Sequence, residues 1–248
     1  MRLLLLNPNT SGFVTERVAA QARKCAQPGT EIVAVGGAFG ARVITTRTEQ
    51  AIAEHATLDA LARHADGCDA VVLAVSYDTA LRAAREMLPI PVVGITEAAL
   101  LTACMLGTRT GVVMFGRRVL PLYQEIAALH GQSARIAGWR ALESDAPYGD
   151  GDQTDVDQLV LDAVADLVAR DGCEVVVLAG AVMAGVPPRL QARATVPLLE
   201  GVSCAVAHAE MLVRLGCPKA RTGSLAALPA RELVGVSPEL QARFRHPP

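Results

Sequence analysis

Four consecutive polar residues, Ser76, Tyr77, Asp78 and Thr79, could carry hydrogen-bond or acid–base chemistry because they directly follow a strongly apolar segment. Residues 70–75 are typical of a buried strand, and open α/β sheets bind ligands just beyond the carboxyl ends of their strands. Capping of the next helix would explain Asp78 or Thr79. It does not explain Ser76 and Tyr77, so we expect one of that pair to lie in a site.

Glu97 occupies a comparable place after the apolar residues 92–95, and we expect its side chain to point toward the mouth of a cleft. A partly buried carboxylate with a raised pKa could act as a general base. The same carboxylate could instead stabilise the N-terminus of a helix. Both interpretations stay open, and Asp78 or Tyr77 could also provide the acid–base group.

Asn9, Thr10 and Ser11 follow the apolar residues 3–6 and begin a predicted helix. The free amide groups of a helix N-terminus can hold a carboxylate or an imide oxygen. Capping of the helix by these same side chains is the structural alternative. We expect all three residues to contribute to substrate binding.

The composition excludes several classes of partner. The net charge is −2, aromatic residues make up 3% and hydrophobic residues 51% of the 248 residues. Such a chain offers neither a basic surface for nucleic acid or anionic lipid nor stacking platforms for bases. The longest apolar stretch, residues 175–186, is shorter than the roughly 18–20 residues of a membrane span. We expect a small-molecule substrate, with no nucleic-acid or membrane partner.

Short apolar segments alternate with segments of helical periodicity along the chain. The clearest helix, residues 155–169, has one apolar stripe, with Thr154 and Asp157 resembling a capping box at its start and Gly172 at its end. This alternation predicts an α/β fold with mainly parallel sheets. The predicted strands are residues 3–6, 31–35, 70–75, 92–95, 111–115, 134–137, 175–179 and 196–199.

A weak internal repeat relates the two halves. Residues 71–76 match 176–181 at an offset of 176 − 71 = 105, and a strand opened by Pro91 recurs at Pro197, at an offset of 197 − 91 = 106. A chance match of Val-rich strands is the alternative, but the shared proline position argues against it. We therefore expect two pseudo-symmetric, Rossmann- or flavodoxin-like α/β lobes, with the turns at 75–79 and 180–184 facing a shared cleft.

The expected boundaries place residues 1–98 and 204–248 in the first lobe and residues 99–203 in the second. The irregular tail after residue 218 is expected to wrap the surface or an oligomer interface, and its last residues to be disordered.

Several motifs occur in a characteristic order. An Asn-Pro-Asn-Thr sequence follows the first strand, and the further matching segments are residues 78–86, 90–95, 97–99, 106–107 and 178–183. In this order they resemble the aspartate/glutamate/hydantoin racemase superfamily, most closely hydantoin and allantoin racemases. The resemblance covers residues 1 to about 220.

The resemblance implies two lobes, a substrate held between them and no cofactor. Racemisation beside a carbonyl needs two acid–base groups on opposite faces of the substrate, and the family uses one cysteine thiol from each lobe. The matching motifs assign the two cysteine positions to Val75 and Gly180, which cannot exchange protons. The two-thiol mechanism is therefore absent. The resemblance also implies substrate contacts for Thr45, Thr46 and Ala181, besides Val75 and Gly180.

The cysteines are expected to be reduced, as in a cytoplasmic protein, and all but Cys217, whose place in a loop is uninformative, are expected to be structural. None belongs to a CxxC pair, and no metal site is predicted. Tyr123 and His208 lie on apolar helices, where we expect structural roles. The cysteines are Cys25, Cys68, Cys104, Cys173, Cys204 and Cys217.

These observations predict a cofactor-independent enzyme of the racemase superfamily. It would act on a small carboxylate or hydantoin-like cyclic amide through carbanion or enolate chemistry beside a carbonyl. A hydrolase or a lyase such as a decarboxylase, with Glu97 or Asp78 as its single base, is one alternative, and a catalytically silent ligand-binding protein is another. The apolar composition and the tail favour a homo-oligomer.

Overall fold

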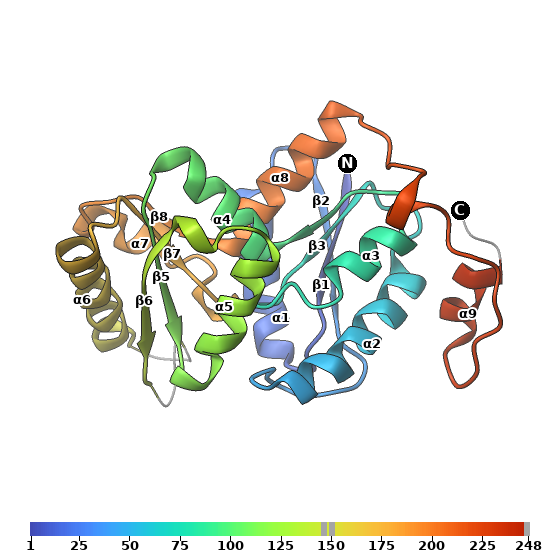
Figure 1. Ribbon diagram of the computed structural model, residues 1–248, viewed down its shortest axis with the longest axis horizontal. Helices are drawn as coiled ribbons and strands as arrows, with labels where there is room; N and C mark the ends of the chain where they lie inside the picture. The colour runs from blue at the N-terminus through green and yellow to red at the C-terminus, as the bar shows by residue number, and fades with distance from the viewer. Residues whose placement is uncertain (145–147, 149–151, 246–248) are drawn as a thin grey trace.

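The computed structural model describes residues 1–144, 148 and 152–245, and it contains two four-stranded parallel sheets (Figure 1). The strand order is β2-β1-β3-β4 in the first sheet and β6-β5-β7-β8 in the second. This arrangement confirms the predicted α/β fold with two similar lobes. The strands are Arg2–Asn7 (β1), Glu31–Gly36 (β2), Ala70–Leu73 (β3), Val92–Gly94 (β4), Thr110–Phe115 (β5), Ile136–Leu142 (β6), Val175–Leu178 (β7) and Leu198–Glu200 (β8).

The helices alternate with the strands in the described part of the chain. The α-helices are Gly12–Cys25 (α1), Arg47–His64 (α2), Leu81–Met87 (α3), Ile95–Leu106 (α4), Leu120–Leu129 (α5), Thr154–Asp171 (α6), Pro187–Leu190 (α7), Gly201–Leu215 (α8) and Pro238–Arg245 (α9). Single turns of 3-10 helix occur at Arg117–Val119 (η1), Ser133–Arg135 (η2), Ala181–Met183 (η3), Gln191–Arg193 (η4) and Gly223–Leu225 (η5).

The internal repeat is a structural repeat. Val71 of β3 pairs with Val92 of β4, and Val176 of β7 pairs in the same way with Leu198 of β8. The offsets are 176 − 71 = 105 and 198 − 92 = 106, the values found in the sequence. The strands are short and apolar because they are covered on both faces, so that residues 3–6 and 70–73 are all buried.

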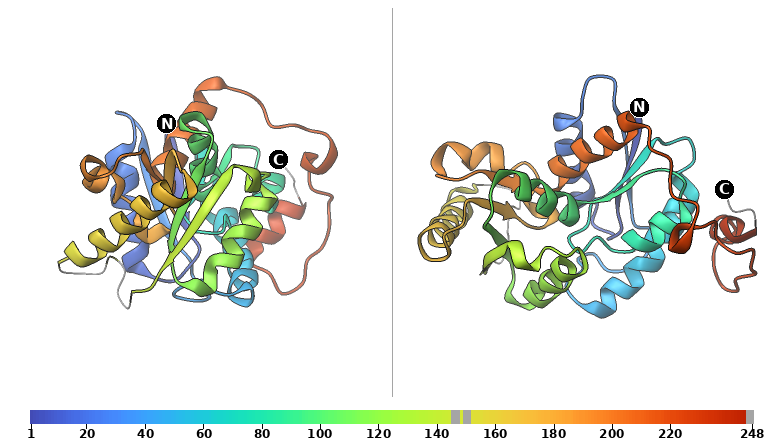
Figure 2. Two further views of the ribbon diagram at one scale, coloured as in Figure 1. Left: turned by 60° about the vertical axis from the view of Figure 1, so that its left-hand side comes forward. Right: turned by 45° about the horizontal axis from the view of Figure 1, so that its top comes forward.

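The two lobes exchange a helix at their boundary. The helix α4 begins after β4 of the first sheet but packs on β5, β7 and β8 of the second, whereas α8 begins after β8 and packs on β3 and β4 of the first. The two helices contact one another between the sheets (Figure 1). On the outer faces, α2 and α3 cover the first sheet, and α6 and α7 cover the second (Figure 2).

Two local predictions are wrong. The strand expected at residues 134–137 is β6, which begins at Ile136 because the preceding residues form the turn η2. The capping box at Thr154 is not formed, since the N-cap of α6 is Gln153. Asp157 is instead held by the guanidinium group of Arg189, with N–O distances of 2.9 and 2.5 Å. Gly172 does end α6 in the left-handed conformation, as expected.

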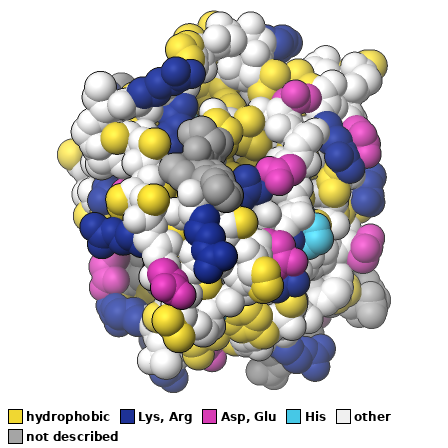
Figure 3. Space-filling view, turned by 90° about the vertical axis from the view of Figure 1, so that its right-hand side faces the viewer, with side chains coloured by type: hydrophobic (Ala, Val, Ile, Leu, Met, Phe, Trp, Pro, Cys, Tyr) yellow, Lys and Arg dark blue, Asp and Glu magenta, His cyan; other side chains and the backbone are white. Residues whose placement is uncertain are grey.

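The tail wraps the first lobe, as predicted. It leaves α8, crosses beside α3 and ends with α9 against α2, where Arg243 donates to the Asp66 carboxylate at 2.6 Å (Figure 1). On this face of the molecule, charges of both signs are interspersed with hydrophobic side chains (Figure 3). Residues 246–248, expected to be disordered, lie outside the described residues. No helix of the described residues has the length and apolarity to cross a membrane.

Candidate active site

A cavity of about 300 Å³ lies between the lobes, beyond the carboxyl ends of the central strands, and is called the interlobe cavity below. Residues 75–77, which follow β3, and residues 180–182, which follow β7, both border it. The prediction that the two repeated turns face a shared cleft is therefore confirmed. The apolar part of its wall includes Val14, Val43, Ile44, Val75, Phe115 and Val119.

A larger cavity of about 480 Å³ lies between α3 and the C-terminal tail. Its ionisable lining residues are Glu86, Lys219 and Arg221, and Lys219 is already bound to the backbone oxygen of Glu86 at 2.6 Å. It lies away from the repeated turns. We favour the interlobe cavity as the active site because ligands of parallel α/β sheets bind beyond the carboxyl ends of the strands.

Two hydroxyl groups meet at the repeated turns. The hydroxyl of Tyr123, which comes from α5, lies beside the side chain of Ser76. A Cβ atom placed on Gly180 would lie 3.4 Å from the Tyr123 hydroxyl and 3.8 Å from Ser76 Oγ. The hydroxyl pair therefore lies against the turn of the second lobe. A structural role was expected for Tyr123, and α5 places this side chain in the wall of the interlobe cavity.

Both cavity-lining tyrosines are neutral phenols near neutral pH. Burial raises the pKa of Tyr123 well above its usual value of 10, and it raises the pKa of Tyr77 likewise. The two rings contact one another with centroids 5.1 Å apart. A neutral phenol can donate a hydrogen bond to a developing negative oxygen but is a poor base. Ser76 and Tyr77 both border the cavity, which agrees with the prediction for that pair.

Only Asn9 of the first polar segment borders the cavity. Its Oδ1 accepts hydrogen bonds from Asn7 Nδ2 at 2.8 Å and from the Ser11 amide at 3.0 Å, which leaves its Nδ2 group to donate to a ligand. The Thr10 amide donates to Ala41, and Ser11 Oγ caps α1 by accepting from the Val14 amide. The structural alternative, helix capping, applies to Ser11.

The two threonines before α2 have different places. Thr45 borders the interlobe cavity, whereas Thr46 is the N-cap of α2 and forms a capping box with Glu49. The Glu49 carboxylate accepts from the amide of Thr45 at 2.7 Å and from that of Thr46 at 2.9 Å. These hydrogen bonds, led by that of the Thr45 amide, hold the pKa of Glu49 below its usual value.

Asp78 lies behind the turn, outside the wall of the interlobe cavity. Its fully buried carboxylate accepts from the amides of Thr96 at 2.9 Å and Glu97 at 2.7 Å, and so caps α4 from a distance in sequence. A Cβ on Gly94 would fall 2.3 Å from Asp78 Cγ, so only glycine leaves room for the carboxylate. Burial raises the pKa of Asp78 while these donors oppose the shift. Thr79 is also buried and does not border the cavity.

The expectation that Glu97 points toward the cleft mouth is wrong. Its carboxylate is held by the guanidinium group of Arg85 on α3, at 3.0 and 2.5 Å, and does not border the interlobe cavity. Glu97 is the third residue of α4, a position from which its side chain turns toward α3. The alternative interpretation, a carboxylate at a helix N-terminus, describes its place.

Two ionisable side chains at or near the site were not predicted from the sequence. Glu143, after β6, is the one carboxylate among the described residues that border the cavity, and its Oε1 accepts from the Arg117 amide at 3.0 Å. His130 follows α5, and its Nε2 lies 2.9 Å from Asp78 Oδ2. Its spacing of 130 − 123 = 7 residues from Tyr123 puts both on one helix face, a signal that was available.

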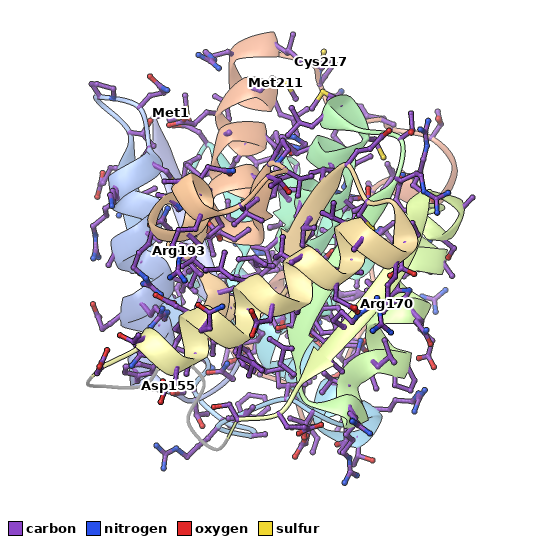
Figure 4. All side chains as sticks on the ribbon, turned by 90° about the vertical axis from the view of Figure 1, so that its left-hand side faces the viewer. Met1, Asp155, Arg170, Arg193, Met211 and Cys217 are labelled. Carbon is purple, nitrogen blue, oxygen red and sulfur yellow. The ribbon has the colours of Figure 1, made fainter. Side chains whose placement is uncertain are left out.

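No cysteine borders the interlobe cavity among the described residues, which include all six. Burial raises the pKa of the Cys204 thiol to about 11, and it raises the pKa of the Cys173 thiol as well. Cys217 is exposed near the outer end of α8 (Figure 4).

His208 Nε2 lies 3.2 Å from Thr102 Oγ1, away from the cavity, as expected of a structural residue. Within the described residues, no group of His, Cys, Asp and Glu side chains is arranged to hold a metal ion.

The outer side of the second lobe supports the cavity wall. The ring of Tyr148 contacts Phe115 edge-on, with centroids 5.9 Å apart, and lies between the guanidinium groups of Arg17 and Arg189 at 5.5 and 5.3 Å. Arg17 belongs to α1 of the first lobe and also donates to the Tyr148 backbone oxygen at 2.9 Å. The wall at Phe115 is thereby tied to both lobes.

Comparison with known proteins places this arrangement in a family. The family description Asp/Glu/Hydantoin racemase matches residues 3–209. A hydantoin racemase from Paenarthrobacter aurescens is 30% identical over 226 residues, which are 90% of this chain and 96% of the relative. The structure of an allantoin racemase from Klebsiella pneumoniae is 33% identical with a TM-score of 0.91, and the alignment covers 97% of this chain and 98% of that one.

A more distant structure shows the same fold. A mutant of arylmalonate decarboxylase in its liganded form is 19% identical with a TM-score of 0.65, over 90% of this chain and 97% of that one. The long match to the family, together with relatives of similar length over nearly the whole chain, decides the assignment. The chain belongs to the Asp/Glu/hydantoin racemase family.

Proposed function

We propose that this protein forms and quenches an enolate or carbanion beside the carbonyl of a small carboxylate or hydantoin-like cyclic amide, without cysteine thiols and without a cofactor. The observation that carries the proposal is the Ser76–Tyr123 hydroxyl pair in the interlobe cavity, against Gly180. Family membership supports an isomerase label, since its relatives are named hydantoin and allantoin racemases.

The hydroxyl pair is suited to stabilising negative charge on oxygen. Burial keeps Tyr123 protonated, so that its hydroxyl can donate to a carbonyl oxygen as that oxygen gains charge, while Ser76 beside it can donate to the Tyr123 oxygen. Donors fixed before the reaction in an apolar cavity are worth far more than in water. Asn9 Nδ2 offers a further donor for a second carbonyl or amide group of the substrate. A cavity of about 300 Å³ suits a small substrate.

Isomerisation on this scaffold needs an acid–base group in place of the thiols. Asp78 and Glu97 are engaged with helix amides and Arg85 outside the cavity, and Tyr77 is a neutral phenol. Glu143 at the cavity rim is therefore our candidate for the base that removes the α-proton, and a proton from solvent would reach the opposite face. Its side chain is 63% exposed, which makes it accessible to both substrate and solvent.

Decarboxylation is the second candidate function, because it needs no base to begin. The bond between the α-carbon and a carboxylate breaks, carbon dioxide leaves, and the electron pair becomes the enolate that the hydroxyl pair stabilises. A proton from solvent then completes the product. The apolar wall favours this step, since it raises the energy of a carboxylate held against Val75 and Phe115.

Incubation in D2O distinguishes these reactions. Single enantiomers of a 5-alkylhydantoin, allantoin, aspartate and glutamate are followed by NMR for α-deuterium uptake and by polarimetry for loss of rotation, each against its rate without protein. An α-substituted malonate is followed for loss of carbon dioxide. Deuterium uptake above background supports isomerisation, and release of carbon dioxide supports the second candidate. Ligand-induced stabilisation with neither reaction would refute both and favour a binding protein.

Independence from thiols has its own test. Iodoacetamide should modify Cys217 first, since it is the exposed cysteine, and any activity found above should persist. Activity that disappears in step with alkylation of one thiol would contradict the proposal.

A cytoplasmic location and self-association remain predictions. Exposed side chains of α4 and α8 such as Met105, Leu106 and Leu215 support self-association, which light scattering can measure.

A further inference from the structure

His130 bridges two carboxylates at the boundary of the lobes. Its Nε2 lies 2.9 Å from Asp78 Oδ2, and its Nδ1 lies 3.5 Å from Glu97 Oε1. Its side chain is 6% exposed. Since both Asp78 oxygens already accept from helix amides, we assign the donor of this hydrogen bond to His130 Nε2. The residue does not border the interlobe cavity, so it does not touch a substrate bound there.

Asp78, the partner of His130, is held in place by groups other than His130. Asp78 is held by the amides of Thr96 and Glu97 and lies directly over Gly94. Glu97 is likewise held by Arg85. His130 therefore meets a rigid part of the first lobe, and the contact constrains whichever segment carries the histidine.

That segment is α5, which comes from the second lobe in sequence but lies against the first. Figure 1 shows α5 between the second sheet and α2, and the tilted right-hand view of Figure 2 shows the same arrangement. Its other polar contacts with the first lobe are the ion pair of Glu125 with Arg47, whose side chains are 59% and 63% exposed, and the bond from Arg82 to Leu129 O at 3.0 Å. Exposed contacts of this kind contribute little.

The same segment carries Tyr123, so two side-chain contacts join it to the turn after β3. The Tyr123 hydroxyl lies beside Ser76, and His130, which directly follows α5, hydrogen-bonds to Asp78, two residues after Ser76. We propose that His130 is a positioning residue, which ties α5 to the turn after β3 and thereby holds the Tyr123 hydroxyl against Ser76. The consequence for catalysis rests on the proposed function, whereas the tether itself does not.

Hydrogen exchange followed amide by amide in the full chain tests the tether. His130→Leu should speed exchange by about tenfold or more in α5 and at the Asp78 amide, which donates to Val75 O, because a buried hydrogen bond between the two segments is lost. The amides of Thr96 and Glu97 should stay protected, because Asp78 still caps them. His130→Gln, which keeps a donor near the position of Nε2, should restore protection. Glu125→Gln, on the same helix, should change exchange by less than about twofold.

Kinetics then connect the tether to the reaction. For any substrate found to turn over, His130→Leu should lower kcat more than it raises KM, and His130→Gln should recover most of kcat, since the donors act on charge that develops during the reaction. If His130→Leu does not fold, His130→Asn, whose shorter side chain cannot reach Asp78, takes its place.

Unchanged exchange in α5 in the leucine variant would overturn the inference. So would deprotection that is as large at Thr96 and Glu97 as in α5, because His130 would then only stabilise the cap of α4. The expected exchange pattern in a protein that turns over no substrate would leave the tether standing and count against the proposed function alone.

Discussion

Gly201 packs directly against Ile95, its counterpart in the internal repeat. A Cβ atom placed on Gly201 would lie 2.7 Å from both Cβ and the backbone oxygen of Ile95. The two residues are the first of α8 and α4, and their separation of 201 − 95 = 106 residues equals the repeat offset. The N-termini of α4 and α8 therefore contact one another at equivalent positions of the two repeats. Each receives a buried carboxylate, from Asp78 for α4 and from Glu200 for α8.

Gly201→Ala should destabilise the fold, because the new methyl group meets a backbone oxygen that cannot move without shifting α4. We expect a loss of about 1–3 kcal/mol or more in the free energy of unfolding, measured by urea denaturation. Gly12→Ala is the matched control. Gly12 also begins a helix, and a Cβ atom placed on it would have nothing within 4 Å. Equal stability of the two variants would contradict the close contact of the helix starts.

Removing either member of the hydroxyl pair should slow the reaction. We expect Ser76→Ala and Tyr123→Phe each to lower kcat/KM on the order of 10²-fold, as for the loss of one oxyanion donor. The double variant should lower kcat/KM by less than the product of the two single effects, because each hydroxyl orients the other. Ser133→Ala, at an exposed position, is the control. Full activity in Tyr123→Phe would remove α5 from the site.

Thiols introduced at the two repeated turns should differ in their effect on stability. Val75→Cys replaces one small buried side chain by another beside the cavity and should be tolerated. Gly180→Cys should be destabilising by about 1–2 kcal/mol, because Gly180 has a φ of 114°, which L-residues rarely adopt. Thermal unfolding measures both. If the double variant folds and gains α-deuterium exchange, the two turns flank the reacting carbon. Equal tolerance of both single variants would contradict the strain at Gly180.

Stability at acidic pH should depend on Glu49. Hydrogen bonds led by that of the Thr45 amide hold the pKa of Glu49 below its usual value of 4.5, so the unfolded chain binds the proton more tightly than the folded protein. This contribution is present above pH 4.5 and is lost as the pH falls through the lowered pKa. Urea unfolding from about pH 6 to pH 3 should therefore show a shallower acid decline in Glu49→Gln than in the unchanged protein. Parallel curves of stability against pH for the two proteins would refute this dependence. Glu54→Gln, at an exposed position, is the control.

Much of the fold could be predicted from local pattern. Strands buried on both faces need continuous apolar residues, so residues 3–6, 70–73 and 175–178 are recognisable by themselves. The repeat located the two turns that border the interlobe cavity. The pattern was least informative at β6, where partly buried residues and Arg140 continue a strand that pairing with β5 maintains.

The site was predicted in outline and not in detail, as Glu97 and Tyr123 show. The sequence placed Glu97 correctly after β4, but Arg85 of another helix decides where its carboxylate points. Tyr123 looked like a core residue of an apolar helix, because nothing local shows that α5 lies against the other lobe. His130 was missed for the same reason, since its partner Asp78 is 52 residues away.

The sequence by itself determined the elements, their order, the repeated turns and the lack of a proton-carrying group at Val75 and Gly180. These follow from side-chain type and periodicity, which act over a few neighbouring residues. Only the tertiary structure decided that Ser76 meets Tyr123, that Asp78 caps α4 and that Glu143 borders the cavity. Such contacts join segments far apart in the chain, and they depend on how the exchanged helices α4 and α8 bring the lobes together.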